Sequence, residues 1–306
     1  MTDAFSEQKR LMRLGAMASV MVAITLIAAK GYAWWLSGSV SLLGSLADSS
    51  LDFLASAVTL FAIIIALRPA DADHRFGHGK AEAIAGLFQT SIIFGSSAFL
   101  IYSSIERIRN PVPIEEGMLG VYVSIFAIFL TLGLVTFQKK VISKTRSVAI
   151  SADRLHYVGD LLLNVAVIAA LLLASVGGFH AVDGYFGLGI ALYIGWNAYQ
   201  ISRTSIDMLM DKEFDSAERE KIFNLVLGSP AVKGIHDLKT RRSGLNVFIQ
   251  FHIELDPDLN LFEAHHIADE VEATVGEEFP NSEIIIHTDP LGLERAETQD
   301  ELGRDK

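Results

Sequence analysis

The sequence contains no cysteine, and it carries little charge for its length. Without cysteine, disulfide bonds and thiolate metal ligands are excluded. Charged residues make up 20% of the 306 residues and hydrophobic residues 51%, with a mean hydropathy of +0.37, whereas about a quarter of an ordinary soluble domain is charged. The net charge of −11 comes largely from the last third of the chain. It argues against a nucleic-acid partner and is compatible with a surface that handles cations.

Six long apolar runs precede residue 211. Each is long enough to cross the hydrocarbon core of a bilayer, which takes about 20 mostly apolar residues. The first run is too long for a cleaved signal peptide, and five more follow it. The sequence therefore predicts a polytopic α-helical membrane protein with six transmembrane helices, at residues 12–36, 40–67, 81–106, 117–138, 148–175 and 183–209.

Basic residues in the short loops predict how these helices are oriented, because lysine and arginine gather on the cytoplasmic side of membrane proteins. Most of the basic loop residues fall on one side of the membrane, whereas the opposite side receives mainly Arg107 and Arg109. We therefore expect both termini, and everything after residue 211, to be cytoplasmic. The residues that indicate this side are Lys9, Arg10, Arg13, Arg68, Arg75, Lys80, Lys139, Lys140, Lys144 and Arg146.

After residue 211 the pattern becomes that of a small soluble domain. Apolar and polar residues alternate over 246–255, which is typical of a strand with one buried face. GSP at 228–230 predicts a turn and Ser243-Gly244 a hairpin turn. The order of elements predicts an α+β domain of the ferredoxin-like or metallochaperone-like kind, αββαβ, with its helices on one face of the sheet. The expected helices are 215–228 and 260–279, and the expected strands are 232–242, 246–255 and 282–288.

The predicted domain boundaries follow from these patterns. Residues 1–211 form the transmembrane domain and residues 212–291 the cytoplasmic domain. Residues 292–306 are polar, and we expect them to be a disordered tail.

Two pairs of polar residues interrupt the second and fifth apolar runs. Asp48 and Asp52 are four residues apart, as are His156 and Asp160, so each pair lies on one helix face. A charge at mid-bilayer costs at least about 2.5–3.5 kcal/mol on insertion scales, so something must neutralise these carboxylates. Three carboxylates and one imidazole suit a tetrahedral, zinc-like ion.

The predicted depths of the two pairs agree. If the second span enters from outside near residue 40, the midpoint of Asp48 and Asp52 is about 15 Å deep at 1.5 Å per residue. If the fifth span enters from inside near residue 149, the midpoint of His156 and Asp160 is about 14 Å deep. Both pairs then fall near the middle of a core about 30 Å thick.

Two other intramembrane residues bear on this hypothesis. Lys30, in the first span, is the base that would pair with the carboxylates if no metal bound there. Asp153 lies one turn before His156 on the same helix face. Its interpretations are a carboxylate on the access path or a charge at the start of the helix.

The two motifs, DxxxD and HxxxD, together with HRFGHGKAE at 74–82, six spans and an αββαβ domain, resemble the cation diffusion facilitator family over nearly the whole chain. Among its members the bacterial zinc and ferrous-iron efflux transporters look most similar. The resemblance implies a homodimer in the bacterial inner membrane that exports Zn²⁺, or Cd²⁺ or Fe²⁺, in exchange for protons by alternating access, without an organic cofactor. It matches the family's transport site to Asp48, Asp52, His156 and Asp160.

The proton coupling also has a chemical reason. Metal ligands must be deprotonated, so a metal ion and protons compete for the same site. Histidine, with an ordinary pKa of about 6.5, is the natural proton carrier.

The loop between the second and third spans holds a second set of ligands, Asp71, His74 and His78. Asp73 is an alternative carboxylate. The resemblance matches the first three residues to a second metal site of the family, with a regulatory role. The alternative is that these side chains are solvated or cap the next helix.

The cytoplasmic domain contains a third set: His236, His252, His265, His287 and Asp289. The resemblance implies a binuclear zinc site at the dimer contact. His236, His252 and Asp289 would hold one ion there. His265, His287 and the bridging Asp289 would hold the other. The alternative is a scatter of surface histidines, and His266, next to His265, competes with it for the assignment.

Two charges near the membrane surface complete the comparison. Lys80 precedes the third span and Asp211 follows the sixth. The resemblance implies that residues at these places pair across the dimer and join the two domains. Their positions alone indicate only charges at a membrane interface, where lysine extends toward water.

Two other classes of function remain to be compared. An intramembrane metallohydrolase would need an open metal position and a general base, and the H-E-x-x-H pattern is absent. The sequence therefore predicts a transporter and not an enzyme. The alternative is a metal-gated channel or a metal sensor without proton coupling.

Overall fold

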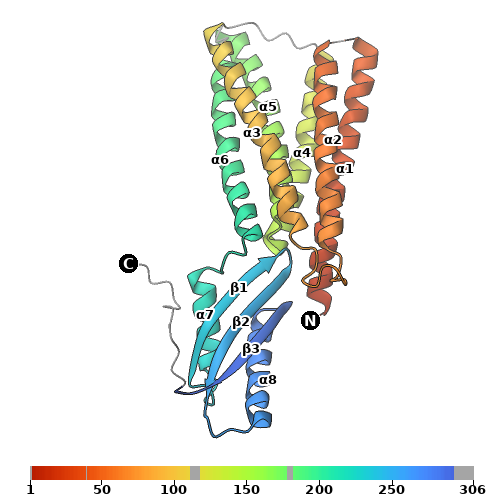
Figure 1. The fold of residues 1–306 in the computed structure, drawn as a ribbon. Coiled ribbons are helices and arrows are strands. Elements are labelled where there is room, and N and C mark those ends of the chain that lie inside the picture. Colours follow the sequence, from red (N-terminus) through yellow and green to blue (C-terminus); the bar gives the residue numbers. More distant parts are fainter. Residues whose placement is uncertain (1, 39, 111–117, 178–181, 293–306) are drawn as a thin grey trace. The chain divides into compact units, whose positions relative to one another are not determined.

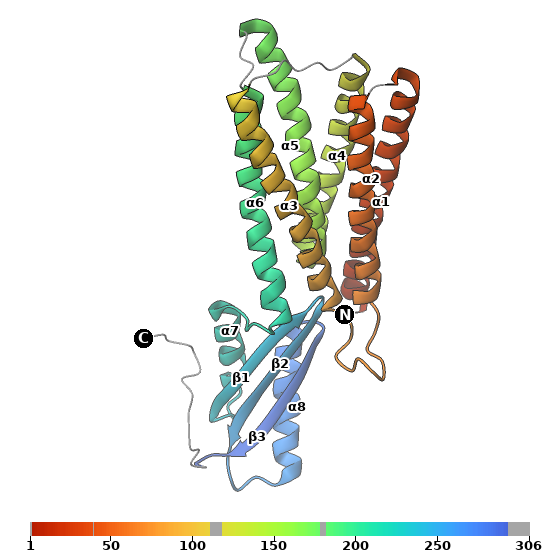
Figure 2. The same cartoon turned by 45° about the horizontal axis from the view of Figure 1, so that its top comes forward.

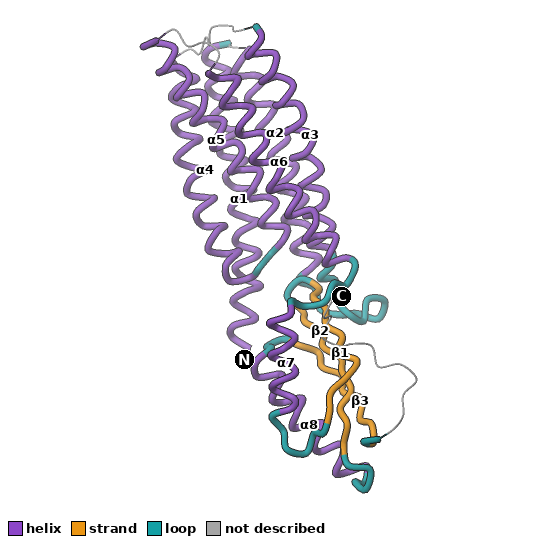
Figure 3. Tube along the Cα trace, turned by 90° about the vertical axis from the view of Figure 1, so that its left-hand side faces the viewer, coloured by secondary structure: helices purple, strands orange, loops and turns teal. Residues whose placement is uncertain are grey.

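The computed structural model describes residues 2–38, 40–110, 118–177 and 182–292. They form two compact units, Thr2–Ile206 and a second unit that begins at Asp207. Helices build the first unit, and the second combines helices with a sheet, as Figures 1 and 3 show. The predicted polar tail lies outside the described residues from position 293 onward.

Six long helices make up the first unit. Each predicted span coincides with one of them, with Leu67 one residue beyond its helix and residue 117 outside the described part of the chain. The helices are α1 (Thr2–Ser37), α2 (Val40–Ala66), α3 (Ala81–Arg109), α4 (Met118–Thr145), α5 (Val148–Gly177) and α6 (Val182–Leu209).

Four of these helices, α1 to α4, are long and apolar enough to cross a membrane by length and composition, judged over the described residues. The other two are as long, with 30 residues in α5 and 28 in α6. The first half of α5 contains Asp153, Arg154 and Asp160, which lower its apolar character. The helix that carries these charges also supplies His156 and Asp160, half of the proposed ligands of the transport site.

The first and fourth helices extend beyond their predicted spans. Helix α1 begins ten residues earlier than the apolar run, at Thr2. This polar extension contacts the end of α4: Lys144 Nζ lies 2.7 Å from a Glu7 oxygen, and the Gln8 amide donates to the Lys144 carbonyl at 2.9 Å. Counting apolar residues finds the membrane-spanning part of a helix, and its polar continuation is missed for that reason.

The helices of the first unit lie side by side (Figure 1), and α1 contacts α2, α4 and α5. Helix α6 packs against α3 and α5, where Ile194 meets Ile93 and Leu155. Gly184 of α6 needs to be a glycine, because a Cβ atom there would lie 2.8 Å from the backbone carbonyl oxygen of Ser104 on α3. Small residues at helix contacts allow such close approach in membranes.

The second unit has the predicted order αββαβ. Strand β1 pairs antiparallel with β2, and β2 pairs parallel with β3, so β2 is central. Figure 2 shows the three strands side by side with the two helices on one face. The elements are α7 (Ser216–Leu227), β1 (Gly234–Ser243), β2 (Asn246–Leu255), α8 (Leu261–Glu278) and β3 (Ser282–Pro290).

Alternation along β2 builds the core of this unit. Val247, Ile249, Phe251, Ile253 and Leu255 are all buried, as the sequence predicts. The buried residues of α7 and α8 pack against them in one cluster. The intervening residues of β2, which include His252, therefore lie on the opposite face of the sheet.

Local signals explain the element ends. The Asp215 side chain accepts a hydrogen bond from the backbone N–H of Glu218 at the start of α7, and Asn260 and Glu263 form a capping box at the start of α8.

The predicted hairpin turn is off by one residue. Ser243 pairs with Asn246, so the loop is Gly244-Leu245, and Gly244 takes the left-handed φ of +60° that favours glycine.

Candidate metal sites

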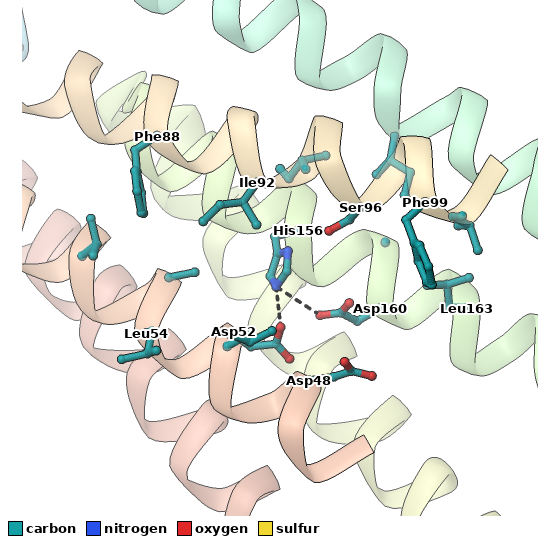
Figure 4. Close-up of a pocket in the computed structure, with 17 residues that line it drawn as sticks. Asp48, Asp52, Leu54, Phe88, Ile92, Ser96, Phe99, His156, Asp160 and Leu163 are labelled. Carbon is teal, nitrogen blue, oxygen red and sulfur yellow. Dashed lines mark hydrogen bonds and ion pairs between the residues drawn. The ribbon is translucent and has the colours of Figure 1, made fainter. Parts of the chain in front are cut away.

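Helices α2 and α5 bring Asp52, His156 and Asp160 together inside the first unit. His156 Nε2 lies 2.7 Å from Asp52 Oδ1 and 3.7 Å from Asp160 Oδ2. Figure 4 shows the imidazole between the two carboxylates. Ligand atoms about 2.1 Å from a tetrahedral ion are roughly 3.4 Å apart. The two observed distances lie on either side of that value, so the three side chains fit a zinc-sized ion with small adjustments.

Asp48 lies one helical turn before Asp52 and lines the same cavity. It is not among the three residues whose ligand atoms all lie within 4.8 Å of one another. The cavity has a volume of 570 Å³. Its wall is mostly apolar and includes Phe88, Ile92, Ser96, Phe99 and Leu163 (Figure 4). Asp48 is therefore available as a fourth ligand only after a change of side-chain conformation or helix position.

Lys30 does not pair with these carboxylates within the part of the chain that the structure describes. Its ammonium donates to Ser49 Oγ at 2.7 Å and to the Ser45 carbonyl oxygen at 3.2 Å. It still lies close enough to Asp52, Asp160 and Asp48 for these three carboxylates to attract its charge. Lys30 is thus a neighbouring charge of the site, and the carboxylates remain open to another cation.

Asp153 has neither of the positions expected for it. It is the sixth residue of α5 and therefore lies beyond the first turn, which contains no acidic residue. It is completely buried and does not line the cavity. Its carboxylate instead accepts hydrogen bonds from Ser19, Ser56 and Gln138. Neither sequence interpretation describes this environment, in which the partners of the carboxylate come from α1, α2 and α4.

The loop between α2 and α3 brings Asp71, His74 and His78 together. Asp71 Oδ1 lies 3.3 Å from His74 Nδ1, and Asp71 Oδ2 lies 3.3 Å from His78 Nε2. The carboxylate also accepts the backbone N–H groups of His74 and Asp73, and these bonds hold the pKa of Asp71 below its ordinary value. The Asp73 side chain is not part of the group. An ionised carboxylate between two imidazoles can bind one cation.

Three histidines lie in a row across the sheet of the second unit. His236 of β1 is paired with His252 of β2, which is paired with His287 of β3. An irregularity in β1 follows directly after His236, where Asp237 has a φ of +51°. Because His236 keeps its pairing with His252, the two rings are 5.2 Å apart between their centres.

Asp289 joins this row of histidines. Its Oδ2 lies 3.0 Å from His252 Nδ1 and 3.3 Å from His236 Nε2, and its Oδ1 lies 3.2 Å from His287 Nε2. The carboxylate is thus placed to face two ions, one on each oxygen. His236, His252 and Asp289 form the compact group.

His265 is not brought to this group. It is 72% exposed on α8, 3.7 Å from Asp269 one turn along its own helix. Its neighbour His266 makes a similar contact with Glu270 at 3.4 Å.

The predicted pair of Lys80 and Asp211 falls on the two separate units. Lys80 directly precedes α3. Asp211 has a φ of +54°, and both of its carboxylate oxygens lie 3.4 Å from an Arg241 nitrogen in its own unit. The predicted link between the two residues stays a prediction.

Comparison with known proteins gives a consistent result over both units. Residues 16–210 match the cation efflux transmembrane domain, and residues 214–291 match the cytoplasmic domain of cation efflux proteins. The cation-efflux pump FieF of Shewanella oneidensis is 48% identical over 92% of this chain and 95% of its own. FieF of Yersinia enterocolitica is 44% identical over 93% and 94%.

A solved structure of CzrB, described as a proposed zinc transporter, is 33% identical, with a TM-score of 0.25, and covers 26% of this chain and 99% of its own. The domain matches and the two pumps confirm the predicted fold class, a multi-pass helical membrane domain followed by an α+β domain. They also make the protein a cation-efflux transporter and not an enzyme. The chain belongs to the cation diffusion facilitator family, in the group of the FieF pumps.

Proposed function

We propose that this protein exports divalent cations, Zn²⁺ first among them and also Cd²⁺ and Fe²⁺, from the bacterial cytoplasm across the inner membrane in exchange for protons. The observation that carries the proposal is the convergence of Asp52, His156 and Asp160 from two helices at one intramembrane cavity. The relatives named as cation-efflux pumps support the direction of transport.

The chemistry of the site supports a coupled exchange. A dication neutralises the carboxylates of Asp48, Asp52 and Asp160, and without it these charges in a largely apolar cavity need protons. Because only the deprotonated ligands bind metal, each metal ion that enters displaces protons. A site that holds either metal or protons, and that opens to one side at a time, acts as an antiporter.

We further propose that the protein is a homodimer with cytoplasmic termini, built from a transmembrane domain of residues 1–211, a metal-binding dimerisation domain of residues 212–291 and a polar tail. In the second domain His236, His252 and Asp289 would hold one zinc ion, and Asp289 with His287 and His265 the other. These ions would crosslink the strands, which is the chemistry a structural zinc supplies. The loop site would regulate transport, and the pair of Lys80 and Asp211 would join the two domains.

Transport into proteoliposomes that contain a pH-sensitive dye tests the central proposal. We expect zinc to enter while protons move the opposite way, and we expect Asp52→Ala to abolish both fluxes. Ser50→Ala is the matched control, because Ser50 is an exposed residue of α2 whose hydroxyl donates to the Leu46 carbonyl oxygen of the same helix. Zinc flux without proton movement would instead indicate a metal-gated channel. Unchanged coupled flux in Asp52→Ala would place the transport site elsewhere.

A further inference from the structure

A buried polar network connects four helices directly beside the proposed transport site. At its centre is Asp153, which is 0% exposed. Its Oδ2 accepts the hydroxyl of Ser19 on α1 and the amide of Gln138 on α4, and its Oδ1 accepts the hydroxyl of Ser56 on α2 at 3.0 Å. All of these partners are fully buried as well.

Tyr157 extends the network toward His156. Its hydroxyl lies 3.0 Å from Ser56 Oγ and donates to the Ser19 carbonyl oxygen at 3.1 Å. The ring of Tyr157 packs edge-on against the ring of His156, with 5.8 Å between their centres. The phenol therefore contacts both the network and a proposed metal ligand.

The positions of these residues along their helices give the network its significance. Ser56 is one turn after Asp52 on α2, and Asp153 is one turn before His156 on α5. The contact of Ser56 with Asp153 and the contact of Asp52 with His156 are therefore neighbouring links between the same two helices. The first link constrains where the second one forms.

Asp153 is stabilised in a different way from the carboxylates of the proposed transport site. Three neutral donors stabilise it, and it forms no ion pair within the described residues. It also does not line the cavity. A buried carboxylate whose oxygens both accept hydrogen bonds makes its surroundings rigid. Exchange of metal and protons instead needs ligand groups that are exposed to the cavity.

We propose that Asp153 is a positioning residue for transport. With Ser19, Ser56, Gln138 and Tyr157 it holds α5 in register with α2, so that the ligand pairs of these two helices form one tetrahedral site. The inference rests on the proposed function of Asp52 and His156. It assigns to the network a role like that of the outer-shell partners of metal ligands, whose loss typically weakens metal binding about 10–100-fold.

Two mild variants test this inference without removing the central carboxylate. Ser56→Ala and Tyr157→Phe each delete one hydroxyl that links α2 to α5. We expect each variant to raise the KM for zinc transport several-fold and the double variant to raise it about 10–100-fold. The Vmax per folded protein should change much less. Asp153→Asn keeps a hydrogen-bond acceptor, so its KM should lie between those of the wild type and Asp153→Ala. Ser205→Ala, a fully buried serine on α6 outside the network, should keep the wild-type KM.

The absorption spectrum of bound Co²⁺ separates positioning from mere stability. The difference between each protein and its own Asp52→Ala counterpart isolates the signal of the transport site. We expect an intense tetrahedral band in wild type and a weakened one in the network variants. An unchanged Co²⁺ band and KM, even with a lower melting temperature, would overturn the inference. If Asp52→Ala changes neither quantity in the wild-type background, the proposed transport site itself fails.

Discussion

Nε2 of His156 on α5 lies 2.7 Å from Oδ1 of Asp52 on α2, although 104 residues separate them in the sequence. The second carboxylate of α5, Asp160, lies 3.7 Å from the same nitrogen. The imidazole is therefore the point at which the two ligand pairs meet. It is also the one nitrogen ligand in a set that is otherwise made of oxygen.

Replacing that nitrogen should change the preferred metal. Carboxylates suit Mn²⁺ and Mg²⁺, whereas imidazole favours zinc. We expect His156→Asp to lower the zinc transport rate at least tenfold and to raise the ratio of Mn²⁺ to Zn²⁺ transport. Proteoliposomes loaded with a metal-sensitive dye give both rates. The idea is wrong if the variant keeps the wild-type ratio of the two metals while losing speed.

The sequence predicts the convergence of Asp52, His156 and Asp160 because its signals are local. Two pairs at i and i+4 fix the helix face, and an apolar run fixes the depth. Alternation along β2 predicts its buried face in the same way. His236, His252 and Asp289 meet through strand pairing, which the order of elements makes foreseeable.

The network around Asp153 has no local signal. Its partners Ser19, Ser56 and Gln138 are separated from it by 134, 97 and 15 residues. Single serines in apolar helices are common, and only the packing of four helices shows which of them meet one carboxylate. The same holds for His265, whose distance from Asp289 depends on tertiary contacts.

Lys30 is predicted to weaken metal binding at the transport site. Its charge acts on Asp52, Asp160 and Asp48 without pairing with them, so it repels a dication that binds there. Lys30→Gln keeps a donor for Ser49 and removes the charge. We expect a severalfold lower KM for zinc and slower turnover, because release becomes harder. Lys30→Arg, which keeps the charge, is the control, and a raised KM in Lys30→Gln would contradict this account.

The loop site should lose metal on acidification through its histidines. The backbone N–H of His74 holds the pKa of Asp71 below its ordinary value, so this carboxylate stays ionised as the pH falls from 7 to 5. Protonation of the imidazoles competes with metal binding, so the loop site should bind metal more weakly as the pH falls. Asp71→Asn should weaken loop binding about tenfold or more at pH 7 and therefore move the acid release of the metal to higher pH.

Metal titrations at several pH values, in a full-length Asp52→Ala background, measure this effect. Asp73→Asn is the matched control, because the side chain of Asp73 lies outside the group of three ligands. If the Asp73 variant loses the metal and the Asp71 variant keeps it, the ligand has been assigned to the wrong carboxylate.

Asp289 and His265 should differ in how many zinc ions they hold in the second unit. Asp289 faces His236 and His252 with one oxygen and His287 with the other, so both proposed ions depend on it. His265 would contribute to one ion only, and within one chain it remains exposed beside Asp269. We expect Asp289→Asn to lower the zinc bound per full-length chain by up to two ions, and His265→Ala to lower it by up to one.

Equilibrium dialysis followed by metal analysis gives these differences, since the transport and loop sites contribute equally to every variant. Glu283→Gln removes another carboxylate from β3 and should leave the zinc content unchanged, because Glu283 lies outside the cluster. Equal losses in Asp289→Asn and His265→Ala would mean that a single ion is bound and that Asp289 does not bridge. A full zinc content in Asp289→Asn would remove this carboxylate from the site altogether, and the row of three histidines would then have to bind metal without it.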